Sequence, residues 1–158
     1  MYTGYVGVRE ATGKNDGAEV ERFLANCGFK KGAHWCGAFV YTCFLEAGIR
    51  PKVRQPAYSP SWFTDTSKVV YRKTWQKTDY KSKKGQVLGL WYPDLNRIGH
   101  IGFIDSEDKT NYHTVEGNVG NGVNRRVRPK SSIYIISDYI NDKDEKTVDW
   151  RNSDAHRN

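Results

Sequence analysis

Two apolar stripes at helical spacing, both in the first third of the chain, limit most strongly what this sequence can fold into. The first stripe repeats at every third or fourth position over Val20–Cys27, and the second runs over Trp35–Ala47. A glycine follows each stripe directly, as is typical of a helix end. Asp16 with Glu19 resembles a capping pair in front of the first stripe. The sequence therefore predicts two helices near the N-terminus.

The character of the sequence changes after these two stripes. Prolines predict an irregular loop over 50–60, and the stretch Ser61–Tyr71 is compatible with a short helix. Helices followed by an antiparallel sheet form an α+β architecture, and 158 residues fit one domain. We expect a single domain over 1–158, with its core at about 10–139 and a polar tail over 140–158. Strands rich in β-branched and aromatic residues are predicted over Gln86–Tyr92, Gly99–Asp105, Tyr112–Glu116 and Ser132–Ile136.

The charge of the chain is positive and unevenly distributed. Lys and Arg number 25 against 18 Asp and Glu, for a net charge of +7. Two basic segments carry the excess: 68–84, whose only acid is Asp79, and 120–130, which has no acid. Such segments attract polyanions such as nucleic acid, anionic membranes or cell-wall polymers, and an ordinary solvated surface is the alternative. No run of eighteen apolar residues exists, so no membrane span is expected.

The three cysteines are Cys27, Cys36 and Cys43. Three cysteines do not form a disulfide framework, and without a C-x-x-C pair a zinc site is not expected. If Cys36 and Cys43 lie on one helix, their Cα atoms are about 10 Å apart, which is too far for a disulfide. At least one thiol is therefore expected to be free.

Cys36 is the candidate nucleophile because it opens the second predicted helix. The unpaired N–H groups and the dipole of a helix N-terminus favour a thiolate. Cys43 lies in mid-helix and is expected to be a packed thiol. A buried cysteine also behaves as a small apolar residue, so a core position is the alternative for Cys36.

The partner of a catalytic thiol is usually a histidine from elsewhere in the fold. His100 lies between two glycines at the start of a predicted strand, where another element can approach closely. On the next strand, alternation places Glu116 and then Asn118 on one face and His113 on the other. A carboxylate or amide beside a histidine fixes its tautomer and supports its positive charge. A surface acid and a turn residue are the alternatives for Glu116 and Asn118.

Three short blocks, in this order, resemble the CHAP family, the cysteine, histidine-dependent amidohydrolases/peptidases of the NlpC-type, papain-like superfamily. They are W-C-G-A-F-V at 35–40, G-H-I-G at 99–102 and T-V-E-G-N at 114–118. The resemblance extends over about 10–139. It departs at Gln86, where the family usually has an acid. The Asp-rich calcium loop of some members is not visible near the N-terminus, so we predict no metal and no cofactor.

This resemblance implies a papain-like fold with Cys36 as nucleophile, His100 as general base, Glu116 as the group orienting His100, and Asn118 as an accompanying polar residue. Aromatic residues are expected to line the substrate groove, with a core position as the alternative for each: Trp35, Tyr58 and Trp62.

The implied function is a cysteine-dependent hydrolase of amide or peptide bonds in bacterial peptidoglycan, acting as a lytic enzyme or toxin on stem peptides or cross-bridges. We expect a monomer, made in the cytoplasm without a visible signal peptide and acting at the cell wall or periplasm. A delivered toxin would also have an immunity protein or inhibitor as partner. The alternative is a non-enzymatic, basic polyanion-binding module, although no specific nucleic-acid motif is present.

Overall fold

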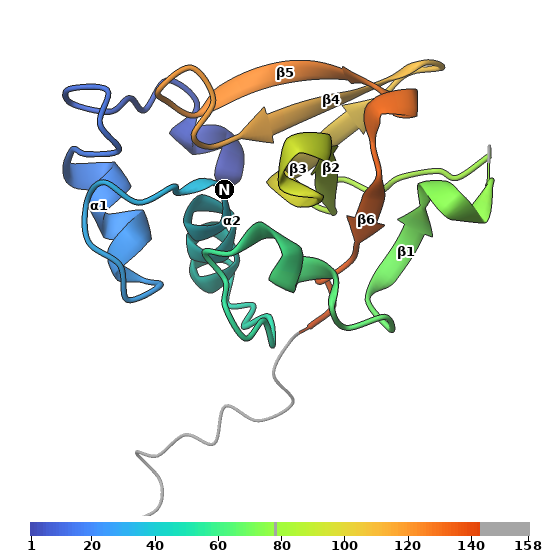
Figure 1. Ribbon diagram of the computed structural model, residues 1–158, viewed down its shortest axis with the longest axis horizontal. Helices are drawn as coiled ribbons and strands as arrows, with labels where there is room; N and C mark the ends of the chain where they lie inside the picture. Colours follow the sequence, from blue (N-terminus) through green and yellow to red (C-terminus); the bar gives the residue numbers. More distant parts are fainter. Residues whose placement is uncertain (78, 143–158) are drawn as a thin grey trace, which may run out of the picture.

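The computed structural model describes residues 1–77 and 79–142 and confirms the α+β class. Within these residues, two α-helices, α1 (Ala18–Ala25) and α2 (Cys36–Glu46), precede a six-stranded antiparallel sheet of order β1-β6-β2-β3-β4-β5 (Figure 1). No helix in the described part of the chain has the length and apolarity needed to cross a membrane. The predicted polar tail lies outside the described residues from 143 onward. The strands are β1 (Val69–Arg72), β2 (Val87–Tyr92), β3 (Arg97–Glu107), β4 (Asn111–Glu116), β5 (Asn124–Pro129) and β6 (Ile135–Ser137).

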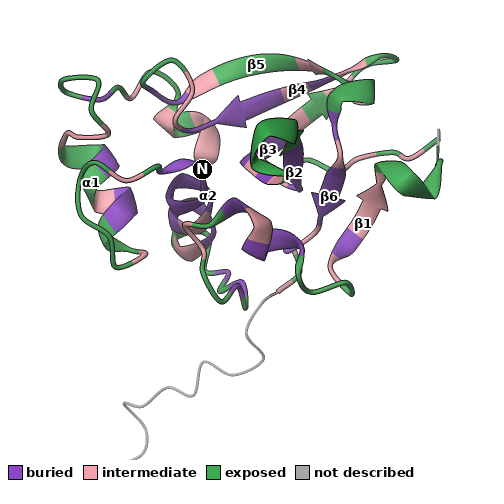
Figure 2. Ribbon diagram, viewed as in Figure 1, coloured by how far each residue is buried: buried purple, intermediate pink, exposed green. Residues whose placement is uncertain are grey.

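Helix α2 lies between α1 and the sheet, which it meets at β3. Figure 2 shows α2 buried around most of its circumference. Its rings pack on the middle of β3: Phe44 and Phe39 lie 5.3 and 6.0 Å, centroid to centroid, from Phe103. Burial on several sides explains why α2 is almost entirely apolar or small, whereas α1 is apolar on one face only.

The sheet is covered on both faces, which explains the nearly continuous apolar sequence of β2. Val87 packs into the cluster that contains both helices. Leu88 and Leu90 belong to a second cluster on the other face, together with Ile104 and Tyr112. Residues from the first basic segment, including Tyr71 and Tyr80, pack against this second cluster.

The predicted capping pair of α1 is wrong. The N-cap is Gly17, and the Asp16 carboxylate instead accepts hydrogen bonds from the N–H and hydroxyl of Thr12, at 2.9 and 2.6 Å. Glu21 accepts a hydrogen bond from the Gly17 N–H at 3.1 Å. The acid in front of the helix therefore stabilises the preceding loop, and an acid in the first turn of the helix supplies the cap.

Three strand assignments, for β2, β3 and β4, are confirmed, with β3 longer than expected. The possible helix over Ser61–Tyr71 is wrong: a 3-10 turn covers Ser59–Phe63, and β1 follows it. The last strand begins at Ile135, after a 3-10 turn over Lys130–Ser132. The sequence did not predict β5, an edge strand whose exposed arginines read as a charged loop.

Candidate active site

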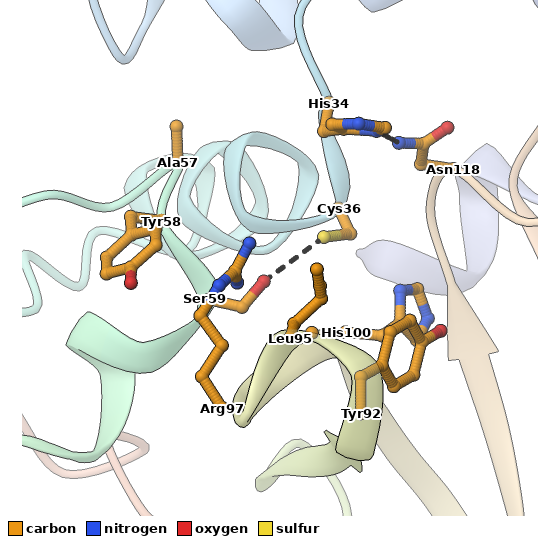
Figure 3. A pocket seen from close by; sticks show the side chains of 11 residues that line it. His34, Cys36, Ala57, Tyr58, Ser59, Tyr92, Leu95, Arg97, His100 and Asn118 are labelled. Atoms are coloured by element: carbon orange, nitrogen blue, oxygen red, sulfur yellow. Dashed lines mark hydrogen bonds between the residues drawn. The ribbon is translucent and has the colours of Figure 1, made fainter.

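A cleft of about 410 Å³ opens at the N-terminus of α2. Its walls come from the start of α2, the turn after the proline-containing loop, the β2–β3 connection and the turn after β4 (Figure 3). Segments far apart in the sequence therefore meet at one thiol. The lining residues are His34, Cys36, Ala57, Tyr58, Ser59, Tyr92, Leu95, Arg97, Gly99, His100 and Asn118.

Cys36 is the first residue of α2, as its position in the sequence predicted. The first N–H groups of any α-helix lack partners within the helix, and the N-cap Trp35 supplies no side-chain hydrogen bond here. The Cys36 Sγ lies 3.4 Å from the Ser59 hydroxyl, the dashed contact in Figure 3. The positive end of α2 and a hydroxyl group therefore both face the sulfur atom.

Gly37 allows Ser59 to reach the thiol. A β-carbon at this position would lie 2.4 Å from the Pro56 carbonyl oxygen and 2.8 Å from that of Ala57. The loop before Ser59 therefore packs directly on the backbone of α2, at a distance that a side chain would prevent. The contact between Ser59 and Cys36 was not predicted, because nothing local to Ser59 indicates it.

His100 and Glu116 meet across the β3–β4 hairpin. Register pairs Phe103 with Val115, so Gly102 lies opposite Glu116. A β-carbon on Gly102 would lie 2.5 Å from the Glu116 Cγ. The absence of a side chain at Gly102 therefore leaves room for the side chain of Glu116. The His100 Nε2 lies 2.8 Å from the Glu116 Oε2. The structure thus brings together Cys36, His100 and Glu116.

Arg128 on β5 completes this arrangement and was not identified from the sequence. Its guanidinium donates two hydrogen bonds to the fully buried Glu116 carboxylate, at 2.9 and 2.6 Å, and the Thr114 hydroxyl donates a third at 2.6 Å. A buried carboxylate needs a cationic partner, and this requirement was the signal that could have pointed to an arginine near Glu116. The basic segment 120–130 read instead as a surface feature.

These contacts set the protonation of the site. Although burial opposes its charge, Arg128 and then His100 lower the pKa of Glu116 to about 2, so it is ionised. Burial alone would lower the pKa of His100, but hydrogen bonds with Cys36 and Glu116 raise it to about 9. Burial would raise the pKa of Cys36, but His100 and Ser59 lower it to about 7. A thiolate–imidazolium pair therefore predominates between these two values.

The other two cysteines are opposite in character. All three thiols are free. Burial raises the pKa of Cys27 to about 11 and raises that of Cys43 further. Neither has a histidine among the groups that shift its pKa. Cys36 therefore stands apart from both as the thiol suited to nucleophilic chemistry.

The first prediction concerns pH. Alkylation of Cys36 by iodoacetamide is expected to rise with pH through a midpoint near 7, because the thiolate reacts and His100 favours it. An ordinary thiol has a midpoint near 8.5. Amide hydrolysis is expected to follow the same rise and to fall through about pH 9, as His100 loses its proton. Alkylation quenched at set times and analysed by peptide mass spectrometry measures the rise with pH. A midpoint above pH 8 would contradict this prediction.

The second prediction ranks substitutions of Glu116. Glu116→Gln retains a hydrogen bond to His100 but loses the charge, whereas Glu116→Ala loses both. We expect hydrolysis to slow in both variants. Glu116→Ala should be the slower of the two, with a rate roughly 100-fold or more below that of wild type. The alkylation midpoint of Cys36 is expected to rise in the same order, as His100 becomes less basic. A purely structural role for Glu116 would leave the midpoint of the folded variants unchanged.

The remaining predicted residues fall into two groups. Asn118 and Tyr58 line the cleft, but the Asn118 amide contacts the His34 Nδ1 at 3.4 Å and not His100. Trp35 and Trp62 are fully buried, so their predicted place in the substrate groove is wrong. Their indole N–H groups donate hydrogen bonds inside the protein, to the carboxylate of Glu10 and the carbonyl of Pro56 respectively.

Two unpredicted residues shape the cleft wall. Tyr92 lies directly over Gly99, where a β-carbon would approach its ring to 2.3 Å. Arg97 places its guanidinium 5.1 Å from the centre of the Tyr58 ring and donates a hydrogen bond to the Ile98 carbonyl at 2.9 Å. No Asp or Glu is among the lining residues. The cleft therefore presents a fixed cation and aromatic surface around the reactive pair.

The arrangement is chemically suited to acyl transfer by a thiolate. Cys36 can attack a carbonyl, the N–H groups at the start of α2 can stabilise the resulting oxyanion, and His100 can move the protons. Among residues 1–77 and 79–142, no group of three His, Cys, Asp or Glu side chains is placed to hold a metal ion. Comparison with protein-family models, curated proteins and solved structures finds no match to this chain.

Proposed function

We propose that this protein is a cysteine-dependent amide hydrolase with a papain-like, CHAP-type catalytic domain. One observation carries the proposal: Cys36, at the start of a helix and open to a cleft, faces a histidine that a buried carboxylate holds. The Nε2 of His100 is bonded to Glu116, which leaves Nδ1 for the thiol. A thiol that serves only in packing does not need a lowered pKa, a neighbouring histidine and a place on a cleft wall together.

The reaction begins when the Cys36 thiolate attacks the amide carbonyl carbon and forms a C–S bond. The His100 imidazolium gives its proton to the leaving nitrogen as the C–N bond breaks, so an amine departs and a thioester remains. Neutral His100 then takes a proton from a water molecule, whose oxygen attacks the thioester. The C–S bond breaks, the thiolate and imidazolium are restored, and a carboxylic acid is released.

Peptidoglycan is the proposed substrate, through the resemblance to the CHAP family. The cleft supports a peptide of this kind: it offers Arg97 for a carboxylate and the exposed rings of Tyr58 and Tyr92 for apolar parts. In this proposal the enzyme acts at the cell wall or periplasm, on stem peptides or cross-bridges, as a lytic enzyme or toxin. An immunity protein or inhibitor would be the partner of a delivered toxin.

Digestion of purified peptidoglycan tests this proposal. Each cut adds one water and creates one new amine and one new carboxyl group, and mass spectrometry of the fragments identifies the bond. Cys36→Ala is the matched control. One outcome separates the thiol from its substrate: Cys36 is alkylated rapidly at neutral pH, but digestion creates no new amine or carboxyl group in peptidoglycan. That result would keep Cys36 as a reactive thiol and would overturn peptidoglycan as the substrate.

The third prediction concerns Arg97. Arg97→Ala is expected to raise KM for a carboxylate-bearing fragment about tenfold, because a charge-assisted contact is lost. The alkylation midpoint of Cys36 should not change, since Arg97 does not contact the thiol or His100. Arg50→Ala removes an exposed arginine outside the cleft and serves as the control. An unchanged KM in the Arg97 variant would remove this residue from substrate binding.

The alternative function is a binding module in which the basic segments hold a polyanion and Cys36 only packs. Several of these bases are already paired within the protein: Lys84 and Arg125 both contact Asp105 at 2.8 Å. The lowered pKa of Cys36 has no purpose in such a module. Slow alkylation of Cys36 at pH 7, equal to that of Cys43, would favour it.

A further inference from the structure

A second cleft, of about 260 Å³, shares no residue with the first. Tyr71, Tyr80 and Tyr112 belong to or pack against the cluster on the face of the sheet away from α2, and they form its walls. The cleft is the point where the two basic segments, 68–84 and 120–130, meet. Its lining residues are Tyr71, Lys73, Gln76, Lys77, Tyr80, Tyr112, Lys130 and Ser131.

Each of the three lysines of this second cleft makes a contact within the protein. The Lys73 ammonium donates a hydrogen bond at 2.9 Å to the carbonyl of Ser131, the residue that directly follows the second basic segment. The Lys130 ammonium lies 5.2 Å from the centre of the Tyr112 ring. The Lys77 ammonium lies 5.6 Å from the centre of the Trp75 ring. Each ammonium has three donors, so these contacts leave donors for a ligand.

The positive charge of the second cleft is largely uncompensated. Other lysines of the first basic segment are paired: Lys68 with Asp142 and Lys84 with Asp105. Lys130 is paired with Glu107 at 3.1 Å. Within residues 1–77 and 79–142, no carboxylate forms an ion pair with Lys73 or Lys77. No Asp or Glu lines the second cleft.

The walls indicate what kind of anion the second cleft would hold. The rings of Tyr71 and Tyr80 lie 5.6 Å apart, centroid to centroid, at 34°, and make one continuous aromatic surface. Gln76 adds an amide and Ser131 a hydroxyl group. Aromatic surface, neutral hydrogen-bonding groups and ammonium groups together match a sugar ring that carries an anionic group. A single-stranded nucleic acid needs a groove that follows successive phosphates, whereas this is a small, separate cleft.

We propose that the second cleft binds one anionic sugar unit, with its carboxylate or phosphate on Lys73 and Lys77 and its ring against Tyr71 and Tyr80. This site is additional to the proposed hydrolytic cleft. It requires no reaction at Cys36, so binding here and hydrolysis there succeed or fail separately. If the proposed function holds, a sugar unit in the second cleft would hold the substrate while its peptide is cut at the first cleft.

The test is a titration of the full ¹⁵N-labelled chain, followed by NMR. The probes are N-acetylmuramic acid, a carboxylate sugar, and glucose 6-phosphate, a phosphate sugar, so the two arms show which anionic group is read. We expect shifts in the amides of 71–77 and of Lys130 and Ser131. The double variant Lys73→Ala with Lys77→Ala is expected to bind about tenfold more weakly or worse.

A matched control removes the same charge elsewhere: Lys14→Ala with Lys30→Ala, both exposed and outside the two clefts, should bind as wild type does. Equal weakening in both double variants would overturn the proposal, because only net charge would then matter. Equal binding of neutral N-acetylglucosamine or of inorganic phosphate would overturn it as well. So would tighter binding of a short single-stranded oligonucleotide to the same amides, which would make the site one for nucleic acid.

Discussion

Replacing Cys36 with alanine is expected to abolish amide hydrolysis, with a loss on the order of 10⁴-fold or more, and to leave the fold intact. The sulfur atom forms the bond to the substrate carbon, and no other cysteine is among the residues that line the cleft. Cys36 lies at the start of α2 and is buried at the edge of the core, where it lines the cleft, and its replacement by alanine removes only the sulfur atom. Product formation is measured by mass spectrometry, and folding by circular dichroism and thermal unfolding. Cys36→Ser should be similarly inactive, because a hydroxyl ionises far less readily.

Cys43→Ala is the matched control for this experiment. Cys43 lies two turns further along the same helix and is 3% exposed. Its truncation leaves a small cavity, so we expect a loss of about 1–2 kcal/mol in the free energy of unfolding. The rate per folded molecule should not change. If Cys36→Ala retained the wild-type rate, or Cys43→Ala lost its rate while folded, the assignment of the nucleophile would be wrong.

The parts of this site that the sequence predicted depend on local periodicity. Helical spacing placed Cys36 at the start of α2, and strand alternation placed Glu116 on the opposite face from His113. The structure agrees: Glu116 is fully buried, whereas His113 is exposed and contacts Asp108 at 2.9 Å. Hairpin pairing then follows almost directly, because β3 and β4 are joined by a short turn.

The parts that the sequence did not predict depend on contacts between distant segments. Ser59 reaches the thiol only because a loop packs on Gly37, and Arg128 reaches Glu116 only because β5 pairs with β4. Edge strands with charged residues give little β signal, so neither β5 nor its arginine was recognised. Trp35 was assigned to the substrate groove because its neighbour in the sequence is the candidate nucleophile. Its own side chain is buried in the core.

Arg128 changes what a substitution at the site means. Glu116 accepts hydrogen bonds from Arg128, Thr114 and His100, so its charge is fully compensated although it is buried. Removing Arg128 would leave that carboxylate with His100 as its only cationic partner among the residues that the structure describes. The resulting rise in the pKa of Glu116 would weaken the support for the imidazolium. The edge strand β5 therefore acts on the thiol through two intermediate groups.

Replacing His100 with alanine is expected to have the second largest effect, a loss of about 10²- to 10⁴-fold in the rate of hydrolysis. His100 has two roles that disappear together. As an imidazolium it lowers the pKa of Cys36, and as a proton carrier it serves the leaving amine and then the attacking water. The alkylation midpoint of Cys36 should therefore move above 8, because burial then dominates and favours the neutral thiol. Rate and midpoint are measured on the same folded preparation.

The other described histidines provide controls of graded severity. His113→Ala removes an exposed ring outside the cleft and should leave both rate and midpoint unchanged. His34→Ala removes a ring at the cleft wall that contacts Asn118, so it should affect KM more than the midpoint. This pattern separates proton transfer from substrate binding, since among these three histidines only His100 contacts the thiol and shifts its pKa. A His113 variant without activity, beside an active His100 variant, would contradict the hairpin geometry on which the assignment depends.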